Sequence, residues 1–296
     1  MMKKTLIIKN NNDDFEKYFN DNIKATGKCK LMTFSDFKQI KCGSTIEGVK
    51  GKILNFFAKV KAIKEFDKII IFDCTRLVLL CWLLKRNNAR LILWHWNVVK
   101  TNSIILRLAN MFCEQWTFDI LDAKKYGWKL NTQFYFCCNK NKACEIKQAF
   151  FCGLDKGRFC IIKRIETFLK KYNIGTDIHM IGLRGKVYDR PWVKSNFLSY
   201  AEVLKKIYNS KILIDIVQPG QVGLTMRVME AIMLNKKLIT NNKYIASEPW
   251  YNKNNVYIIG VDSDEDFTSF VINGTEIDEK VKIYYDFSTW LDRFDQ

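Results

Sequence analysis

The run Lys68-Ile69-Ile70-Ile71-Phe72-Asp73 decides the class of fold. Its apolar residues follow one another without the polar alternation of a strand that has one face in water. Such a run is typical of a strand covered by helices on both faces, as in parallel sheets. The sequence therefore predicts an α/β protein with a parallel sheet, in which Asp73 ends the third strand.

Strands and helices alternate on both sides of this run, which is the pattern of βαβ units. The other strands predicted in the first half are Thr5–Lys9, Lys30–Thr33, Arg90–Trp94, Gln115–Asp119 and Gln133–Phe136. The helices predicted there are Asp14–Ile23, Lys50–Phe66, Arg76–Lys85 and Ser103–Phe112.

The alternation starts again near residue 147. Strands are predicted at Ala149–Cys152, Asp177–Ile181, Lys211–Ile216, Lys237–Thr240 and Asn255–Ile259. Helices are predicted at Gly157–Tyr172, Ala201–Asn209, Leu224–Leu234 and Asp278–Phe294. We therefore expect two Rossmann-like domains with parallel sheets, residues 1–146 and 147–275, and a cleft between them. A C-terminal helix in residues 276–296 is a candidate to pack back on the first domain.

The charge of the chain indicates an anionic partner. The sequence has 296 residues, with 48 Lys and Arg against 31 Asp and Glu, and a net charge of +17. This excess attracts nucleic acid, an anionic membrane surface or phosphorylated substrates. The chain is also rich in Lys, Asn and Ile together, so a bias in base composition is an alternative source of much of the surplus.

The ten cysteines include no CxxC pair, and the chain has two histidines. A structural zinc site needs four well-spaced ligands, so we expect no metal site, and scattered cysteines suggest a reducing compartment. The N-terminus lacks the apolar core of a signal peptide, and the longest apolar run, Leu77–Leu84, is shorter than the roughly 20 residues of a membrane span. We expect a cytoplasmic protein, with the inner face of the cytoplasmic membrane as a candidate location.

Two loops in the second half follow predicted strands and lead into predicted helices, Gly153–Arg158 and Gln218–Thr225. Ligands of parallel sheets bind outside the carboxyl ends of the strands. The free amides and the dipole of a helix start attract anions there. Lys156 and Arg158 add positive charge, and arginine can bind phosphate oxygens with two parallel hydrogen bonds. Since the first loop alone also fits an ordinary turn, the predicted anion site depends on both loops.

Arg227 and Glu230 are three positions apart in the helix that follows the second loop, so they share a face. One interpretation is a local ion pair on a surface helix, worth about 0.5 kcal/mol. The other is that Glu230 accepts hydrogen bonds from a ribose diol while the loop amides hold a diphosphate. The position just after a phosphate-type loop favours the second interpretation.

The segment from Gln221 to Ile239 is similar to the donor-binding segment of GT-B fold glycosyltransferases with a family-4-like donor domain. In that segment a glycine-rich loop leads into a helix that ends in Glu-Ala, followed by a spacer, a lysine and a buried strand. The matching positions are Gly223, Glu230, Ala231, Lys236 and Ile239. Val222 stands where the family has a glutamate, and Thr225 and Asn235 stand where it has glycines. Residues 151–157 similarly resemble the first loop of that donor domain, and the resemblance covers roughly residues 147–260.

The resemblance implies an enzyme that moves a hexose from a nucleoside-diphosphate sugar to a growing bacterial surface glycan, such as lipopolysaccharide, O-antigen or capsule. The partners would be the nucleotide-sugar and a glycan or lipid-linked oligosaccharide acceptor, with no nucleic acid. No metal or other cofactor is expected. The implied donor-binding residues are Gly153, Lys156, Arg158, Gln221, Gly223, Leu224, Thr225, Arg227 and Glu230.

The first half offers His95 and Asp73 as catalytic candidates. His95 follows a strand between Trp94 and Trp96, and it could act as a base or help to form an aromatic platform for a sugar. The alternative is an interior histidine bonded to a backbone carbonyl. Asp73 could deprotonate an acceptor hydroxyl, or it could cap the helix that begins near Thr75.

A stripe of five apolar residues runs along the predicted helix Lys50–Phe66: Ile53, Phe56, Phe57, Val60 and Ile63. Lysines occupy other positions of that helix. Most stripes of this kind face a protein core, whereas some rest on an anionic membrane. Both interpretations stay open, and a lipid-linked acceptor would favour the second.

Two rival functions remain. Asp262-Ser263-Asp264 resembles the metal-binding DxD of GT-A fold transferases, whose carboxylates hold Mn²⁺ or Mg²⁺ against the diphosphate. An acidic solvated loop explains this segment better, because it lies near the end of the chain. The net charge of +17 also suggests a nucleic-acid-binding protein, but the basic residues are spread along the chain and no such motif is present. A catalytically inactive relative that serves as a scaffold is a third possibility.

Overall fold

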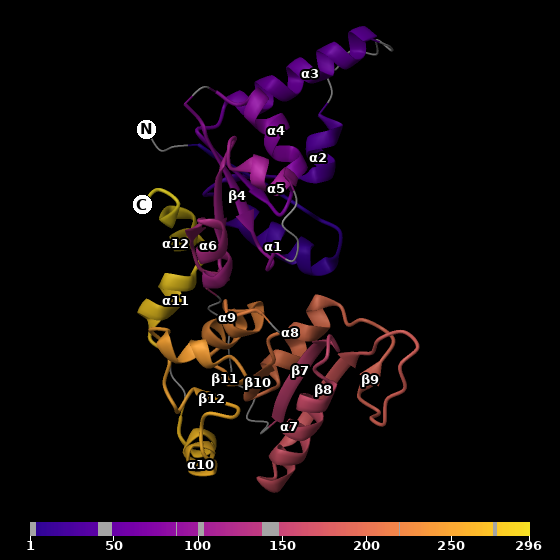
Figure 1. Ribbon diagram of the computed structural model, residues 1–296, viewed down its shortest axis with the longest axis vertical. Helices are drawn as coiled ribbons and strands as arrows, with labels where there is room; N and C mark the ends of the chain where they lie inside the picture. The colour runs from indigo at the N-terminus through magenta and orange to yellow at the C-terminus, as the bar shows by residue number, and fades with distance from the viewer. Residues whose placement is uncertain are drawn as a thin grey trace. The chain divides into compact units, whose positions relative to one another are not determined.

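The computed structural model describes residues 4–40, 49–86, 88–99, 104–137, 148–218, 220–274 and 277–296. The chain divides into two compact units, Met1–Asn131 and Thr132–Gln296 (Figure 1). Each unit contains one six-stranded sheet in which every pair of neighbouring strands is parallel. The predicted α/β class with two parallel sheets is confirmed.

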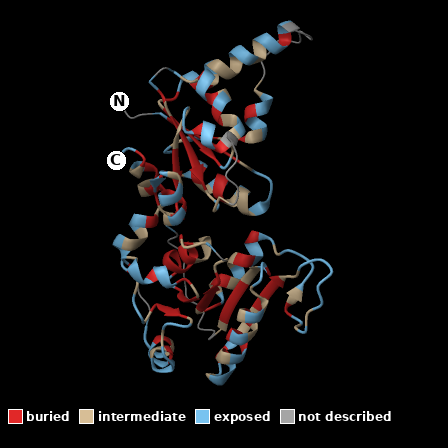
Figure 2. Ribbon diagram, in the orientation of Figure 1, coloured by how far each residue is buried: buried red, intermediate tan, exposed pale blue. Residues whose placement is uncertain are grey.

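The sheet of the first unit has the strand order β2-β1-β3-β4-β5-β6. Its strands are β1 (Thr5–Lys9), β2 (Lys30–Thr33), β3 (Lys68–Phe72), β4 (Arg90–His95), β5 (Glu114–Thr117) and β6 (Lys129–Leu130). Its helices are α1 (Asp14–Ala25), α2 (Phe34–Gln39), α3 (Val49–Lys64), α4 (Thr75–Leu84), α5 (Ile104–Ala109) and α6 (Ile120–Tyr126). All five residues of β3 are buried, as the unbroken apolar run predicts. Buried residues are concentrated in the strands of both sheets (Figure 2).

Helices α2, α3, α4 and α5 pack on one face of this sheet. Phe37, Ile63, Val78 and Leu106, one from each helix, belong to the same core cluster as strand residues such as Leu93. Polar side chains fix the starts of several helices, because they bond to amides that the helix itself leaves free. Asp13 caps α1, Thr33 forms a capping box with Asp36 at the start of α2, and Asp119 caps α6.

The sheet of the second unit has the strand order β12-β11-β10-β7-β8-β9. Its strands are β7 (Gln148–Leu154), β8 (Gly175–Ile181), β9 (Val193–Lys194), β10 (Ile212–Asp215), β11 (Lys237–Thr240) and β12 (Val256–Ile258). Its helices are α7 (Phe159–Lys171), α8 (Tyr200–Tyr208), α9 (Met226–Met233), α10 (Asp264–Ile272), α11 (Glu279–Tyr285) and α12 (Phe287–Arg293), with a 3₁₀ turn at Lys243–Ser247. Strands β10, β11 and β12 are fully buried.

Two predicted elements were wrong. The single helix Asp278–Phe294 is two helices, because Asp286 has an extended backbone and its carboxylate caps the start of α12. The predicted strand Gln133–Phe136 forms only an isolated bridge between Tyr135 and Asp286. Short elements such as α2, α6 and β9 were not predicted, since they contain too few residues to display a period. Helix α10 was also not predicted, although it is as long as α8.

Candidate functional site

The candidate site lies at the carboxyl edge of the second sheet, where β7 and β10 are neighbours. Helix α7 begins after the loop that follows β7, and α9 begins after the loop that follows β10. Because both strands point the same way, their carboxyl ends and the two loops meet at one edge of the sheet. Two helix starts with their free amides therefore face the same region.

The loop after β7 makes a tight turn through two left-handed residues, Lys156 (φ 40°) and Gly157 (φ 84°). Asp155 is buried, and its carboxylate accepts hydrogen bonds from the Phe159 amide (3.0 Å) and the Tyr188 hydroxyl (2.7 Å). Its backbone carbonyl accepts from the Arg158 amide at 2.7 Å. These bonds fix the turn, and they leave Lys156 exposed at its tip.

Arg158 lies over Gly153. A Cβ atom added at position 153 would lie 3.3 Å from Arg158 Nη1, so a glycine there makes room for the guanidinium. Within the described part of the chain, the buried Nε of Arg158 has no hydrogen-bond partner. Burial lowers the pKa of Arg158, while the charges of Asp215 and Asp155 raise it. A buried guanidinium nitrogen without a partner is costly, and an anion would satisfy it.

The start of α9 depends on Thr225, one of the positions that depart from the family pattern. Its hydroxyl accepts from the Val228 amide at 3.4 Å and donates to Asp215 Oδ1 at 2.9 Å. The threonine thus caps the helix and connects it to the end of β10. Its neighbours Gln221, Gly223 and Leu224 precede the cap in the same loop, where the Gln221 side chain reaches the Gly223 carbonyl at 3.5 Å.

Asp215 is a buried carboxylic acid that the sequence analysis did not single out. Its Oδ2 has no hydrogen-bond partner among the described residues. Burial raises the pKa of Asp215 to about 6, against the opposing influence of the Thr225 hydroxyl and the charges of Arg227 and Arg158. Its position as the last residue of a buried strand, just before a glycine-containing loop, was a signal that could have identified it.

Arg227 and Glu230 form an ion pair in the interior rather than on the surface. Arg227 Nη1 lies 2.6 Å from Glu230 Oε2, and the side chain of Glu230 is 3% exposed. The Tyr200 hydroxyl donates to Glu230 Oε1 at 2.7 Å and lies 2.8 Å from the Tyr135 hydroxyl. The Arg227 guanidinium also lies over the ring of Phe150, with 5.3 Å to its centroid. Both oxygens of Glu230 therefore have protein partners. Each could still accept a further hydrogen bond, so it is the burial of the side chain that obstructs the predicted ribose contact.

The structure brings most of the predicted donor-binding residues to one edge of the sheet. The charges of Arg158, Arg227 and Glu230 all act on Asp215. Tyr200 joins the group from α8, thirty positions before Glu230, and nothing in the local sequence predicted it.

His95 lies in the interior of the first unit. Its Nε2 is 2.8 Å from Gln115 Oε1, and its ring stacks on Trp128 with 4.2 Å between centroids. Burial lowers the pKa of His95 to about 4. These contacts favour the structural interpretation, with a side-chain amide in place of the expected backbone carbonyl.

Asp73 is exposed at the carboxyl end of β3, with a left-handed backbone (φ 48°). Its carboxylate accepts from the Trp96 amide (2.9 Å) and from Asn97 Nδ2 (2.8 Å). It does not cap α4, whose cap position is Cys74. Lys9, at the end of β1, is buried, forms an ion pair with Glu16 and lies over the ring of Trp96. Burial lowers the pKa of Lys9 to about 8.

The segment with Asp262 and Asp264 forms a turn and a helix start. Asp262 Oδ2 accepts from the Ile258 amide at 2.6 Å, and Ser263 caps α10, whose first residue is Asp264. Among the described residues, no three His, Cys, Asp or Glu side chains are grouped so that they could hold a metal ion.

Comparisons with known proteins identify the fold. Neither the protein-family models nor the curated proteins contain a match to this chain. Several solved structures resemble it over almost its whole length, among them the following two. HepE from Anabaena in complex with UDP-glucose has a TM-score of 0.53 at 9% identity, covering 99% of this chain and 98% of that one. AviGT4, a glycosyltransferase involved in avilamycin A biosynthesis, has a TM-score of 0.50 at 10% identity, covering 99% and 96%.

The chain has the GT-B fold.

The second unit is the one whose sequence resembles the donor domain of GT-B fold glycosyltransferases. The cluster of Arg158, Asp215, Arg227 and Glu230 lies at the carboxyl edge of its sheet. The first unit contains the other Rossmann-like sheet of the chain, and Asp73 lies at the carboxyl edge of that sheet.

Proposed function

We propose that the chain is a glycosyltransferase that binds a nucleoside-diphosphate sugar at the carboxyl edge of the second sheet. The observation that carries this proposal is the buried Nε of Arg158, which lacks a partner among the described residues and stands at the start of α7. A diphosphate would satisfy it, together with the free amides at the starts of α7 and α9. HepE, which has the same fold, was solved with UDP-glucose and with UDP and glucose.

In this proposal Lys156 and Arg158 neutralise the diphosphate. No metal ion or other cofactor takes part, because the two side chains and the helix dipoles offset the charge that develops on the leaving group. Glu230 exchanges its bond with Tyr200 for the ribose hydroxyls, and Arg227 keeps the remaining oxygen in place.

The first unit binds the acceptor, and Asp73 is the proposed base. It stands at a strand end in a backbone conformation that residues other than glycine rarely adopt, and such conformations are concentrated at functional sites. We further propose that the acceptor is a lipid-linked or growing bacterial surface glycan, as in lipopolysaccharide, O-antigen or capsule synthesis. The reaction would then take place at the cytoplasmic face of the membrane.

A thermal-shift and calorimetric panel of UDP, GDP and CMP, with and without sugars, tests the proposal. Arg158→Ala should lower the affinity for the preferred nucleotide by about tenfold or more, since a bidentate charged contact is lost. Arg164→Ala is the matched control, because Arg164 lies on the same helix with its side chain exposed. Equal affinities of the two variants would contradict the assignment. Activity that is lost on chelation and restored by Mn²⁺ would instead favour the metal-dependent alternative with Asp262 and Asp264.

A further inference from the structure

Three neighbouring helices of the first unit, α3, α4 and α5, carry large apolar side chains that are exposed to solvent. Helices α3, α4 and α5 each contribute to the same core cluster on one face of that sheet, through residues such as Ile63, Val78 and Leu106. Helix α3 packs beside α4, and α4 packs beside α5. Helix α3 extends beyond its neighbours, and part of its apolar stripe is exposed there (Figure 1). We call the exposed side chains of these three helices, together with Met111 just after α5, the α3–α5 face.

The α3–α5 face is unusually apolar for a protein surface. Phe57, Leu83 and Met111 are 60%, 61% and 74% exposed. The apolar stripe of α3 is divided between two environments, since Ile63 is buried while the residues before it open to solvent. The exposed apolar side chains of the face are Ile53, Phe56 and Phe57 on α3, Leu79, Trp82 and Leu83 on α4, and Leu108 and Met111 on and after α5.

The charges of the same face all have one sign. Helices α3, α4 and α5 contain no Asp or Glu. Within the described ranges, no carboxylate forms an ion pair with the lysines at positions 50, 52, 61 and 64 or with Arg76. The exposed cations of the face are Lys50, Lys52, Lys61 and Lys64 on α3, Arg76 on α4 and Arg107 on α5.

We propose that the α3–α5 face binds the surface of a bilayer that contains anionic lipids. Large contiguous apolar patches on a protein surface mark interaction sites. Exposed Phe, Trp and Leu beside Lys and Arg suit the boundary between lipid headgroups and acyl chains, where rings and aliphatic chains insert and cations meet phosphates. A protein partner fits less well, because lysine is depleted from protein–protein interfaces.

Such binding is peripheral. Across the residues that the structure describes, none of the helices combines the length and the apolar character needed to cross a bilayer. The inference deepens the proposed function, since a lipid-linked acceptor would be encountered at this face of the first unit. Only the biological role of the membrane binding rests on the proposed function. The binding itself needs no nucleotide.

Co-sedimentation of the full chain with vesicles tests the inference. Vesicles of pure phosphatidylcholine are compared with vesicles that contain about 30% phosphatidylglycerol. The protein should bind the anionic vesicles, and binding should fall steeply when salt is raised to about 0.5 M. The double variants Phe57→Ser/Leu83→Ser and Lys52→Glu/Lys61→Glu should each reduce partitioning by about tenfold or more.

Matched controls come from the second unit. Val261→Ser/Ile272→Ser removes apolar side chains of similar exposure, 63% and 74%, and Lys171→Glu/Lys205→Glu makes the same change in net charge at exposed lysines. Both should bind as the parent chain does. Equal losses in the apolar test and control pairs would overturn the proposal. Equal losses in the two lysine pairs would also overturn it and attribute binding to net charge alone. Self-association that disappears with Phe57→Ser/Leu83→Ser, without vesicle binding, would overturn it in favour of a second copy of the chain.

The nucleotide panel is repeated on every variant. Unchanged nucleotide affinity together with lost vesicle binding supports the membrane surface. Vesicle binding without any nucleotide affinity contradicts the proposed function and leaves the membrane surface standing.

Discussion

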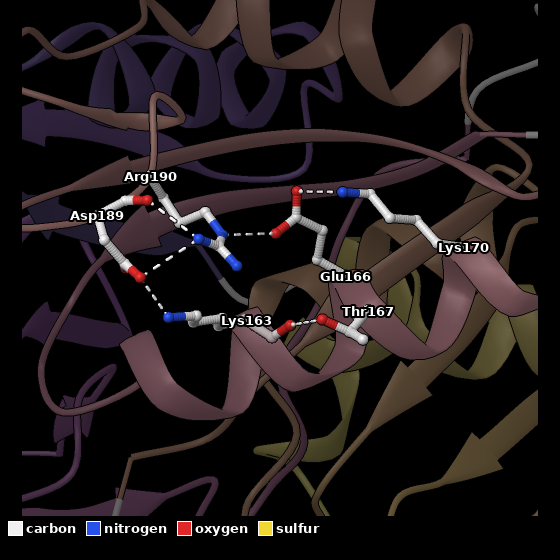
Figure 3. A network of polar contacts seen from close by, with 6 residues as sticks. All are labelled: Lys163, Glu166, Thr167, Lys170, Asp189 and Arg190. Carbon is white, nitrogen blue, oxygen red and sulfur yellow. Dashed lines mark hydrogen bonds and ion pairs between the residues drawn. The ribbon is translucent and has the colours of Figure 1, made fainter.

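Helix α7 and the α3–α5 face are both rich in basic residues, yet their surroundings differ. Around α7, Lys163 pairs with Asp189, and Glu166 binds both Arg190 (3.1 Å) and Lys170 (3.4 Å) (Figure 3). On the α3–α5 face the exposed cations share their helices with exposed phenylalanine, tryptophan and leucine, and those helices contain no carboxylates. The comparison teaches that the net charge of +17 is uninformative until each cation is placed beside its neighbours.

The same contrast separates surface charges from interior charges. The cations of the α7 ion pairs are at least partly exposed, and Lys170 is 69% exposed, although Glu166, the partner of Lys170 and Arg190, is buried. At the carboxyl edge of the second sheet, Asp215 and Glu230 are buried among arginines. Removing a partner of such a buried charge should change the free energy of unfolding strongly, since water does not screen the charge that remains. The predictions below begin with those charges.

Replacing Glu230 should have the largest effect on stability. Glu230→Ala leaves the buried guanidinium of Arg227 without its carboxylate, which should cost about 3–5 kcal/mol of unfolding free energy in urea titrations. This result would make the alanine variant unsuitable for testing ribose binding. Glu230→Gln, which keeps a hydrogen-bond acceptor for Tyr200, is the variant to use in the nucleotide panel.

Lys170→Ala is the surface control for that prediction, because it removes an exposed cation from Glu166, which keeps its bond with Arg190. It should change the unfolding free energy by less than about 1 kcal/mol. A similar cost for Glu230→Ala and Lys170→Ala would erase the distinction between the interior and surface charges.

Asp73→Asn tests the role of the first unit. If Asp73 is the base, kcat should fall by about 100-fold, while stability should change little because asparagine can still accept from the Trp96 amide. Release of the nucleotide from the preferred donor, with an acceptor found by screening, measures the rate. His95→Gln should retain kcat, since its imidazole is buried against Gln115 and Trp128. A large loss of kcat in His95→Gln and a small one in Asp73→Asn would instead favour His95 as the catalytic base.

Asp215→Asn tests the carboxylic acid that faces Arg158. The pKa of Asp215 is raised from 3.8 to about 6, so the folded state holds its proton more tightly than the unfolded state does. Its contribution to stability is therefore most favourable below about pH 4 and declines as pH rises to about 6. The wild type should lose about 2–3 kcal/mol of unfolding free energy over that interval relative to Asp215→Asn. Parallel pH profiles of the two proteins, measured by urea unfolding, would show that Asp215 does not titrate in this range.

Local sequence patterns determined the class of fold and the two loops. Unbroken apolar runs such as Lys68–Phe72 specify strands covered on both faces, and their alternation with helices specifies parallel sheets. The glycine-containing loop before Glu230 was recognisable because its chemistry lies within a few consecutive residues. The division of the predicted C-terminal helix into α11 and α12 and the short helices were not recognisable, because such boundaries depend on single capping residues such as Asp286.

Only the tertiary structure decided which side chains meet and which face outward. Asp215 ends β10, Arg158 stands at the start of the helix that follows the neighbouring strand β7, and the two are far apart in sequence. Tyr200 reaches Glu230 from another helix. The stripe of α3 has one helical period throughout, yet its end at Ile63 is buried while Phe57 is exposed. A period fixes which residues share a side of a helix, whereas the length of helix that the core covers is set by the neighbouring helices and the sheet.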